Sequence, residues 1–275
     1  MSRCKVIAIA NQKGGTGKTT TTINLGMGLV NQGKKVLLVD ADPQGDLTAA
    51  LGWRNADDLS VSLATHMEKF IRDEPFDCTE GMLHHEEGID LIPGNIELAG
   101  TEVSLVNAMS REITMKSCLQ DIKNKYDYVL IDCMPSLGML TINALAASDS
   151  VIIPVQAHYL PAKGMTQLVR TVTKVQRQIN PALRIDGVLL TLADIRTNLA
   201  KETEISLRKN YGRILKIYDT VIPLSIKAAE TSAAGKSIYV YDKGGKAAKA
   251  YEELAREVVR DAEKARHKSQ SARSR

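Results

Sequence analysis

Hydrophobic residues along the chain gather into short continuous runs that polar segments separate. The runs are rich in Val, Ile and Leu, and such runs are typical of strands that are buried on both faces of a parallel sheet. We predict strands at KVIAIA (5–10), KVLLVD (35–40), IDLIPG (89–94), YVLID (128–132), SVIIPVQ (150–156), IDGVLLTL (185–192) and ILKIYDTVIP (214–223).

Between most of these runs lie segments whose apolar residues recur at helical spacing. TTTTINLGMGLVNQG (19–33) ends in a glycine stop, and PAKGMTQLVRTVTKVQRQIN (161–180) is a long amphipathic segment. The polar, irregular stretch from 55 to 88 predicts peripheral helices and loops. Strands that alternate with helices predict an α/β fold, namely a doubly wound, mostly parallel sheet with helices on both faces.

Length and composition indicate one domain. The chain has 275 residues, of which 44% are hydrophobic, and no linker rich in Pro or Gly interrupts it. A chain of this size is long enough for one large core. We predict a single domain from 1 to 266, followed from 267 to 275 by a basic, serine-containing tail that is disordered.

Charge, cysteine content and hydrophobic run length bear on the partners and the cellular compartment of the protein. The formal net charge of +4 is mildly basic, and it neither requires nor excludes a nucleic-acid partner. The four cysteines form no C-x-x-C pair, which is typical of reduced, structural thiols in a cytoplasmic protein. No apolar run approaches the ~20 residues of a membrane span.

A glycine-rich loop, NQKGGTGKTT, lies between the first predicted strand and the first predicted helix. This context is that of a phosphate-binding loop, in which backbone N–H groups and the helix N-terminus face the phosphate oxygens. Lys18 would bridge the β- and γ-phosphates, and the hydroxyl of Thr19 would bind Mg²⁺. The predicted phosphate-binding residues are Lys13, Gly14, Gly15, Thr16, Gly17, Lys18, Thr19 and Thr20.

The loop departs from the usual pattern G-x-x-x-x-G-K-[ST] in two ways. Gln12 replaces the first glycine, and a second lysine, Lys13, follows it. Lys13 lies at the crest of the loop, where its side chain would point across the phosphates. A cation there could neutralise charge on the γ-phosphate of a nucleotide in a facing subunit, as an arginine finger does. The alternative is that Lys13 is a solvated surface lysine.

Three carboxylates, Asp40, Asp42 and Asp132, each stand at the C-terminal end of a predicted strand. Ligands of open α/β sheets bind at this edge. Each residue alone could be a structural cap, but three of them converge beside the phosphate loop. Asp132 follows YVLI and is predicted to be the Walker B acid, which holds Mg²⁺ mostly through its water.

The motifs together resemble those of a known family. KGGTGKTT with Lys13 at its start resembles the deviant Walker A motif of the ParA/MinD family of ATPases. The resemblance covers roughly residues 4 to 260 and is nearest the Soj-like ParA partition ATPases. Further similar segments are VLLVDADPQGDLTAALG (36–52), YVLIDCMPSLGMLTINAL (128–145), LLTLADIRTNLAKE (189–202) and YDTVIPLSIKAAE (218–230).

The resemblance implies roles for several residues. It implies an ATP-sandwiched homodimer in which Lys13 reaches across the interface. It assigns Asp42 to orienting or deprotonating the attacking water, so that the catalytic set is Lys13, Lys18 and Asp42. Asp40 would support the metal site through a hydrogen bond to Thr19 or to a Mg²⁺ water, so that the metal set is Thr19, Asp40 and Asp132.

The base pocket is less well defined by the resemblance. The loop after DTVIP would contact adenine, which makes Pro223 and Ser225 candidates. Ser225 stands where relatives often have Asn, and this change puts its side-chain contact in doubt. The alternative is an ordinary turn at a strand end. Met134 also departs from the family, which usually carries Pro there, and we expect it to affect local stiffness only.

The family includes several functions, and the sequence favours DNA partition. Arg196 matches a DNA-contacting arginine of Soj-like proteins, and Lys227 lies among the lysines of the C-terminal third. We expect non-specific binding of double-stranded DNA, a ParB-like partner that stimulates hydrolysis, and a cytoplasmic, nucleoid-associated location.

Three other functions of the family fit less well, and two further ones remain as alternatives. The C-terminal helix lacks bulky apolar residues for membrane binding, no thiolate pair supports iron–sulfur carriage, and no C-terminal tyrosine cluster supports a kinase. The remaining alternatives are a MinD-like ATPase that positions another cargo and a small-molecule P-loop enzyme.

Overall fold

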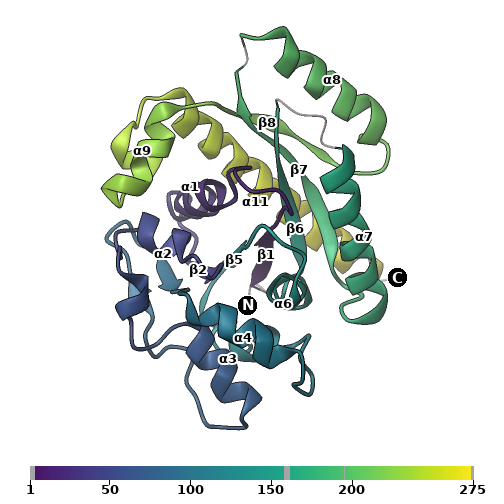
Figure 1. Cartoon of the computed structure of the whole chain (residues 1–275). Coiled ribbons are helices and arrows are strands. Elements are labelled where there is room, and N and C mark those ends of the chain that lie inside the picture. Colours follow the sequence, from purple (N-terminus) through teal and green to yellow (C-terminus); the bar gives the residue numbers. More distant parts are fainter. Residues whose placement is uncertain (1–3, 158–161, 195, 274–275) are drawn as a thin grey trace.

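The computed structural model describes residues 4–157, 162–194 and 196–273, and within them eight strands form one central sheet (Figure 1). Every neighbouring pair of strands in this part of the chain is parallel except β3 and β4. This confirms the predicted mostly parallel sheet. In spatial order the strands are β3 (Leu83–His84), β4 (Asp90–Ile92), β2 (Val36–Ala41), β5 (Tyr128–Cys133), β1 (Lys5–Ile9), β6 (Ser150–Gln156), β7 (Arg184–Ala193) and β8 (Ile217–Pro223).

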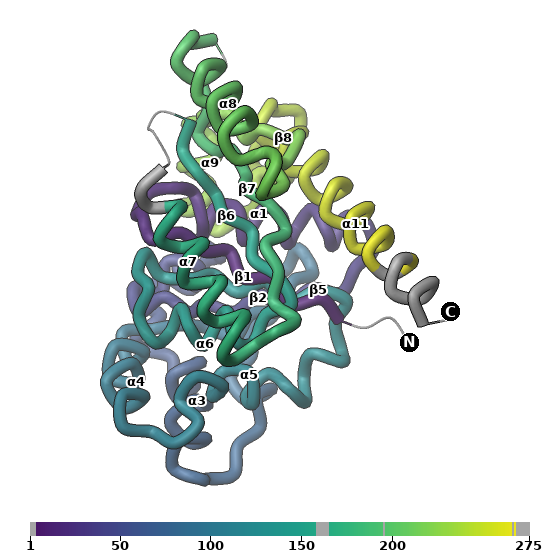
Figure 2. Tube along the Cα trace, turned by 90° about the vertical axis from the view of Figure 1, so that its right-hand side faces the viewer, coloured from purple at the N-terminus to yellow at the C-terminus, as the bar shows by residue number. Residues whose placement is uncertain are grey.

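Helices cover both faces of the sheet, as predicted. One face packs against α1 (Lys18–Val30), α2 (Asp46–Ala50), α9 (Ile226–Ala234), α10 (Ile238–Tyr241) and α11 (Lys246–Arg273). The other face packs against α3 (Leu63–Ile71), α4 (Glu97–Leu105), α5 (Thr114–Leu119), α6 (Met139–Ala147), α7 (Ala162–Gln178) and α8 (Asn198–Tyr211). Short 3₁₀ helices η1 (Ala56–Asp58) and η2 (Lys123–Lys125) lie in the connections. Figure 2 shows α11 on the opposite side of the sheet from α6 and α7.

The continuous apolar runs of the sequence follow from this double coverage. In β1, Val6 and Ala8 belong to the core on one face, whereas Ile7 and Ile9 belong to the core on the other. All four side chains are at most 4% exposed. Because successive side chains of a strand point to opposite faces, a strand covered on both faces needs an apolar residue at every position.

The register of the central strands brings the functional segments to one edge of the sheet. In parallel pairing, Asp132 of β5 lies beside Ile9 of β1 and beside Asp40 of β2. The loop that follows β1 therefore begins next to both carboxylates. This edge, at the carboxyl ends of the strands, is where ligands bind in open α/β sheets.

The stretch from 55 to 88 contains η1, α3 and the two-residue strand β3. Helices and loops were predicted here, but the short strand was not. β3 pairs antiparallel with β4 through only two residue pairs. A strand this short forms only because it pairs with β4, so the hydrophobic pattern of its own residues does not predict it.

The C-terminal helix α11 continues to Arg273, so the predicted boundary between 266 and 267 falls inside a helix. Over the described residues, the backbone is therefore helical where we expected a disordered tail. The division into one domain and a tail remains a prediction. In the same part of the chain, no helix is both long and apolar enough to cross a membrane. The four cysteines are all buried, and they form no disulfide with one another.

Candidate active site

The glycine-rich loop joins β1 to α1 and is built for an anion. Gly15 and Gly17 have φ angles of 68° and 78°, in the left-handed region that favours glycine. Gly17 is the N-cap of α1, and no side chain of the described residues caps this helix end. The first N–H groups of α1 are therefore available to a ligand, and the helix dipole favours a negative charge at this position.

Lys18 lies beneath the loop rather than on its surface. Lys18 is only 7% exposed, and its Nζ donates a hydrogen bond of 3.4 Å to the carbonyl oxygen of Lys13. A lysine that bonds to the backbone of its own loop is positioned inside the loop, where it can contact a phosphate group that the loop encloses. This position agrees with the phosphate-binding role predicted for Lys18.

Three polar residues that the sequence analysis did not identify fix the shape of the loop. Asn11 accepts a hydrogen bond of 3.0 Å from the backbone N–H of Lys13 and donates one of 2.6 Å to the carbonyl of Pro154. Thr191, at the end of β7, donates a hydrogen bond of 2.8 Å to the carbonyl of Thr16. These contacts tie the loop to β6 and β7.

Gln156, the last residue of β6, is the third of these residues and makes two contacts with the loop. Its Oε1 accepts a hydrogen bond of 3.2 Å from Nζ of the exposed Lys13. Its Nε2 donates a hydrogen bond of 2.6 Å to the carbonyl of Gly15. The aspartates were identified because each is a polar residue at the C-terminal end of an apolar strand. Gln156 has the same position at the end of β6, so the same criterion would have identified it.

Asp132 is buried at the end of β5 and faces the start of α1. Its carboxylate accepts hydrogen bonds from the hydroxyls of Thr19 (2.7 Å) and Thr22 (3.2 Å). Burial and, to a smaller extent, the nearby charge of Asp40 raise the pKa of Asp132 to about 8. The two threonine hydroxyls stabilise the charged form only in part, so this site favours a cation near the carboxylate.

Asp40 is in a different position from the one we expected. The hydroxyl of Thr19 bonds to Asp132 and not to Asp40. Asp40 instead accepts hydrogen bonds from the backbone N–H (2.9 Å) and the hydroxyl (2.7 Å) of Thr48 and from the N–H of Asp42 (3.3 Å). Thr48, in α2, is close enough to satisfy Asp40 because the chain turns back between 42 and 46. Of the two partners predicted for Asp40, Thr19 is therefore wrong, and the bond to a Mg²⁺ water stays a prediction.

Asp40 and Asp42 have environments that separate their roles. Burial raises the pKa of Asp40 to about 6, although three hydrogen bonds oppose the shift. Asp42 is 8% exposed and accepts one hydrogen bond, of 3.0 Å, from the N–H of Gln44. Burial also raises the pKa of Asp42. Asp40 thus fixes the turn that carries Asp42, and Asp42 keeps carboxylate lone pairs available for a ligand.

The oxygen atoms at this edge suit Mg²⁺. Asp132, Asp42 and the hydroxyl of Thr19 are hard oxygen donors, and burial raises the pKa of both carboxylates, so a cation beside them would stabilise their charged forms. No three acidic, histidine or cysteine side chains of the described residues converge on one metal position. Mg²⁺ commonly uses one or two protein oxygens and completes its shell with phosphate oxygens and water, so the residues present fit such an ion.

The candidate adenine and DNA residues follow β7 and β8 at the same edge. Pro223 ends β8, and the hydroxyl of Ser225 accepts a hydrogen bond of 3.2 Å from the N–H of Ala228, which caps α9. The N–H of Leu224 donates a hydrogen bond of 3.0 Å to the carbonyl of Ala193, which joins the two loops. The capping contact is a structural role that the sequence analysis did not assign to Ser225.

Arg196, in the loop after β7, and Lys227, in the first turn of α9, are exposed, and each contacts an acid. Arg196 forms a two-point ion pair with Asp194, with both N–O distances at 2.9 Å. Lys227 forms an ion pair of 2.8 Å with Asp242. Exposed ion pairs are weak, so both cations can exchange their carboxylate partner for another anion.

Comparison with known proteins agrees with this site. The sequence profile of the AAA domain matches residues 4–185. The chain is 46% identical to the sporulation initiation inhibitor protein Soj of Bacillus subtilis (strain 168), across 93% of this chain and 98% of that protein. The chain belongs to the ParA/MinD family of ATPases. The matched region includes the phosphate loop and all three aspartates.

One further relative and one solved structure are also similar to this chain of the ParA/MinD family. It is 39% identical to the chromosome partitioning protein ParA of Caulobacter vibrioides (strain NA1000 / CB15N), across 93% of this chain and 94% of that protein. Among solved structures it resembles one named cobyrinic acid a,c-diamide synthase from Mycobacterium smegmatis, with bound ATP analogue and magnesium. The TM-score is 0.82 at 36% identity, with 94% and 95% of the two chains covered.

Proposed function

We propose that this chain is a Mg²⁺-dependent ATPase that forms an ATP-sandwiched homodimer, binds double-stranded DNA without sequence preference and acts in DNA partition. One observation carries the proposal. The loop has two lysines with opposite surroundings, since Lys18 is buried under the loop and Lys13 is exposed on its crest. The first suits the phosphates of its own subunit, and the second is accessible to a facing one.

The residues of the site divide the work of ATP hydrolysis. Lys18 and the N–H groups of the loop bind the phosphates of the nucleotide. Thr19 and Asp132 would hold the Mg²⁺ ion, which supplies positive charge to the phosphate oxygens as negative charge develops there. Asp42 orients the attacking water, because its carboxylate lies at the same edge and keeps free lone pairs. Asp40 positions Asp42 through the turn that they share.

Lys13 would act on the nucleotide of the partner subunit. Two ATP molecules that face each other bring many negative charges together across an interface. A cation from each side offsets this repulsion in a partly desolvated site. Proteins named for chromosome partitioning, such as the Caulobacter relative, support an ATPase of this type.

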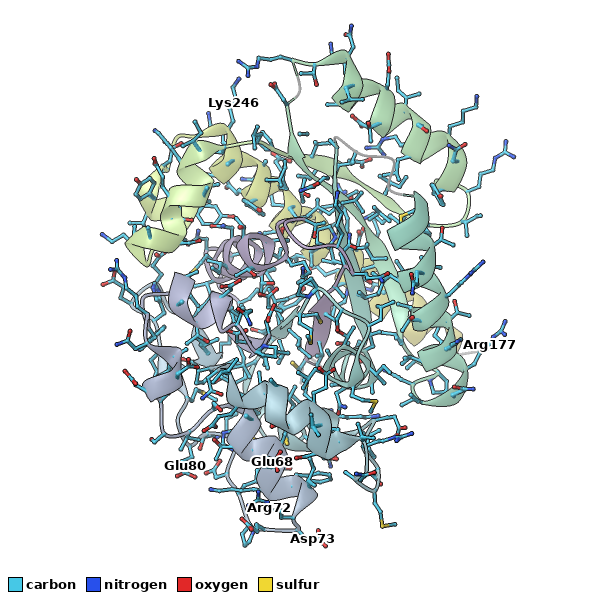
Figure 3. The ribbon with its side chains drawn as sticks, in the orientation of Figure 1. Glu68, Arg72, Asp73, Glu80, Arg177 and Lys246 are labelled. Carbon is cyan, nitrogen blue, oxygen red and sulfur yellow. The ribbon has the colours of Figure 1, made fainter. Side chains whose placement is uncertain are left out.

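The distribution of charge supports DNA as the substrate surface. Residues 56–112 contain thirteen acidic and three basic residues, whereas residues 162–275 contain twenty-three basic and twelve acidic residues. α3 and α4 lie at one end of the molecule and α8 at the other (Figures 1 and 2). Figure 3 shows Glu68, Asp73 and Glu80 near the first end, with Arg72 among them, and Lys246 toward the second end, whereas Arg177 lies at the side of the molecule. An excess of basic residues in this part of the chain favours binding to phosphates without reading of the sequence.

Arg196 and Lys227 lie in the basic part of the chain and are the residues that we propose to contact DNA phosphates. A ParB-like partner would stimulate hydrolysis and so release the dimer from DNA, and a chain with these properties would be associated with the nucleoid in the cytoplasm.

The proposal is tested by co-sedimentation of the protein with DNA in the presence of ATP, ADP or no nucleotide. Binding of unrelated DNA sequences only with ATP is the expected result. Binding that is absent in all three states would instead favour the alternatives, a MinD-like ATPase that positions another cargo or a small-molecule enzyme. The solved structure named as a diamide synthase keeps the second alternative open to this test.

A further inference from the structure

Gln156 bridges two points of the phosphate loop through opposite ends of one amide. The oxygen faces the Lys13 ammonium at 3.2 Å, and the nitrogen faces the Gly15 carbonyl at 2.6 Å. Only this orientation of the amide is chemically consistent. A flipped amide would place an NH₂ group against an ammonium and a carbonyl oxygen against a carbonyl oxygen.

This contact holds Lys13 within its own subunit. Lys13 is exposed, and a long flexible lysine side chain could point in many directions. Its hydrogen bond to Gln156 selects one direction, toward the end of β6. A lysine that serves the facing subunit must point outward, so the contact with Gln156 competes with that use.

We propose that Gln156 is a positioning residue that retains Lys13 in the monomer and releases it when a second nucleotide-bound subunit approaches. The neutral amide makes the contact weak enough to break, because an uncharged acceptor binds an ammonium less tightly than a carboxylate does. Gln156 therefore sets the threshold for dimerisation. This inference rests on the proposed function, in which Lys13 acts across the dimer interface.

Two substitutions at this position should shift dimerisation in opposite directions. Gln156→Glu converts the contact into an ion pair and strengthens the retention of Lys13. An exposed ion pair changes an equilibrium constant by up to about fivefold, and we take about threefold as a middle value. Two such contacts break for each dimer, so the dimer dissociation constant should rise about tenfold. Gln156→Met has similar length but no acceptor, and it should lower the dissociation constant by up to about the same factor.

The experiment measures dimerisation by sedimentation velocity with ATPγS and Mg²⁺, and nucleotide affinity of the dilute monomer with a fluorescent ATP analogue. The rate at which an amine-reactive ester acylates Lys13 in the nucleotide-free protein is measured by mass spectrometry, with the exposed Lys243 as internal standard. We expect slower acylation in Gln156→Glu and faster acylation in Gln156→Met. Dimerisation is compared at nucleotide concentrations that saturate each variant, because both variants lose the donor to the Gly15 carbonyl.

A purely structural role for Gln156 would give a different pattern. Both variants would then shift dimerisation in the same direction, because both lose the donor to Gly15. The inference is overturned by that result or by unchanged acylation of Lys13. Lys13→Ala separates the two proposals. If Lys13→Ala dimerises like wild type, the role of Lys13 across the interface fails. If it does not dimerise while both Gln156 variants behave like wild type, only the role of Gln156 fails.

Discussion

At the residue scale, the two lysines of the phosphate loop differ in burial and contacts although five positions separate them. Lys18→Ala should abolish nucleotide binding, because it removes the buried cation that the β- and γ-phosphates share. Lys13→Ala should bind nucleotide as a monomer with wild-type affinity and fail to dimerise. Titration with fluorescent ATP and sedimentation of the same samples measure both effects. Near-wild-type affinity of Lys18→Ala would show that the loop does not bind phosphates in the way described.

Asp42 is the residue whose loss should separate binding from turnover. Asp42→Ala should keep nucleotide affinity, because Lys18, Thr19 and Asp132 remain, and should lower the hydrolysis rate at least about a hundredfold. Steady-state phosphate release measures the rate, and dimers should accumulate with ATP. Asp42→Asn is the matched control, since it keeps the size and removes the charge. Wild-type turnover in either variant would remove Asp42 from the mechanism.

The sequence was sufficient to find the charged residues of the site, but it did not predict the residues that form hydrogen bonds with them. Asp40, Asp42 and Asp132 end apolar strands, and this position is visible in the sequence. The bond of Asp40 to Thr48 was not predictable, because it depends on how the chain turns back into α2. Which hydrogen-bond partner a strand-end side chain reaches is decided by tertiary packing, and the sequence pattern contains no measure of it.

At the element scale, the contact between α1 and its neighbours α10 and α11 depends on a missing side chain. A Cβ atom at Gly28 would lie 2.5 Å from Oη of Tyr239 and 2.9 Å from Cβ of Ala255. Gly28→Ala should therefore lower the free energy of unfolding by about 1–3 kcal/mol. Gly100, on the exposed side of α4, has no atom within 4 Å of the same position. Gly100→Ala should stabilise the protein by up to about 1 kcal/mol, because alanine favours the helix.

Tyr239 allows this interpretation to be tested further. Its hydroxyl is buried without a hydrogen-bond partner among the described residues, so Tyr239→Phe should be neutral or stabilising. The same change removes the nearest obstacle to a side chain at position 28. Urea unfolding of the single and double variants should show that Gly28→Ala costs less in the Tyr239→Phe background. Equal costs in both backgrounds would place the strain elsewhere.

His66 of α3 should make stability depend on pH. Its side chain is buried, and desolvation lowers its pKa below the usual 6.5. The neutral form is therefore favoured in the folded state. Its contribution is fully present above pH 6.5 and is lost as the pH falls through the lowered pKa. Thermal unfolding between about pH 7 and pH 5 should show a larger loss of stability in wild type than in His66→Gln. Parallel curves would contradict this role.

The central strands, which are buried on both faces, were predicted well from the sequence. β6 was predicted with the bounds 150–156 that the structure shows, because each of its residues must be apolar or end the strand. The region around α3 and β3 was predicted only as helices and loops. Its elements lie at the edge of the sheet, where half-exposed positions tolerate polar residues and the hydrophobic period is weak.

At the scale of the whole molecule, DNA binding should depend on cations and weaken with salt. Arg196→Glu should lower DNA affinity equally for unrelated sequences and should reduce the slope of log affinity against log salt by about one. ATP-dependent dimerisation should stay unchanged, because Arg196 lies outside the phosphate loop. Fluorescence anisotropy over a salt series measures the slope. Lys69→Glu, at α3 in the acidic part of the chain, is the matched control. An unchanged slope in Arg196→Glu would move the DNA-binding surface elsewhere.

In the proposed function, the contrast in charge between the acidic part of the chain (56–112) and the basic part (162–275) would affect how the molecule meets DNA as well as how tightly it binds. A particle with opposite charges at its two ends has an electric dipole, and a polyanion exerts a torque on it. The end with α3 and α4 would be turned away before contact, and the basic part of the molecule would arrive first. Protein association is slowed chiefly by the search for the correct orientation. Since the field extends only about 8 Å at physiological ionic strength, alignment occurs in the last step of each encounter. Released subunits that diffuse near DNA would therefore collide often in a productive orientation, and the rate of rebinding would be set by the exchange of nucleotide.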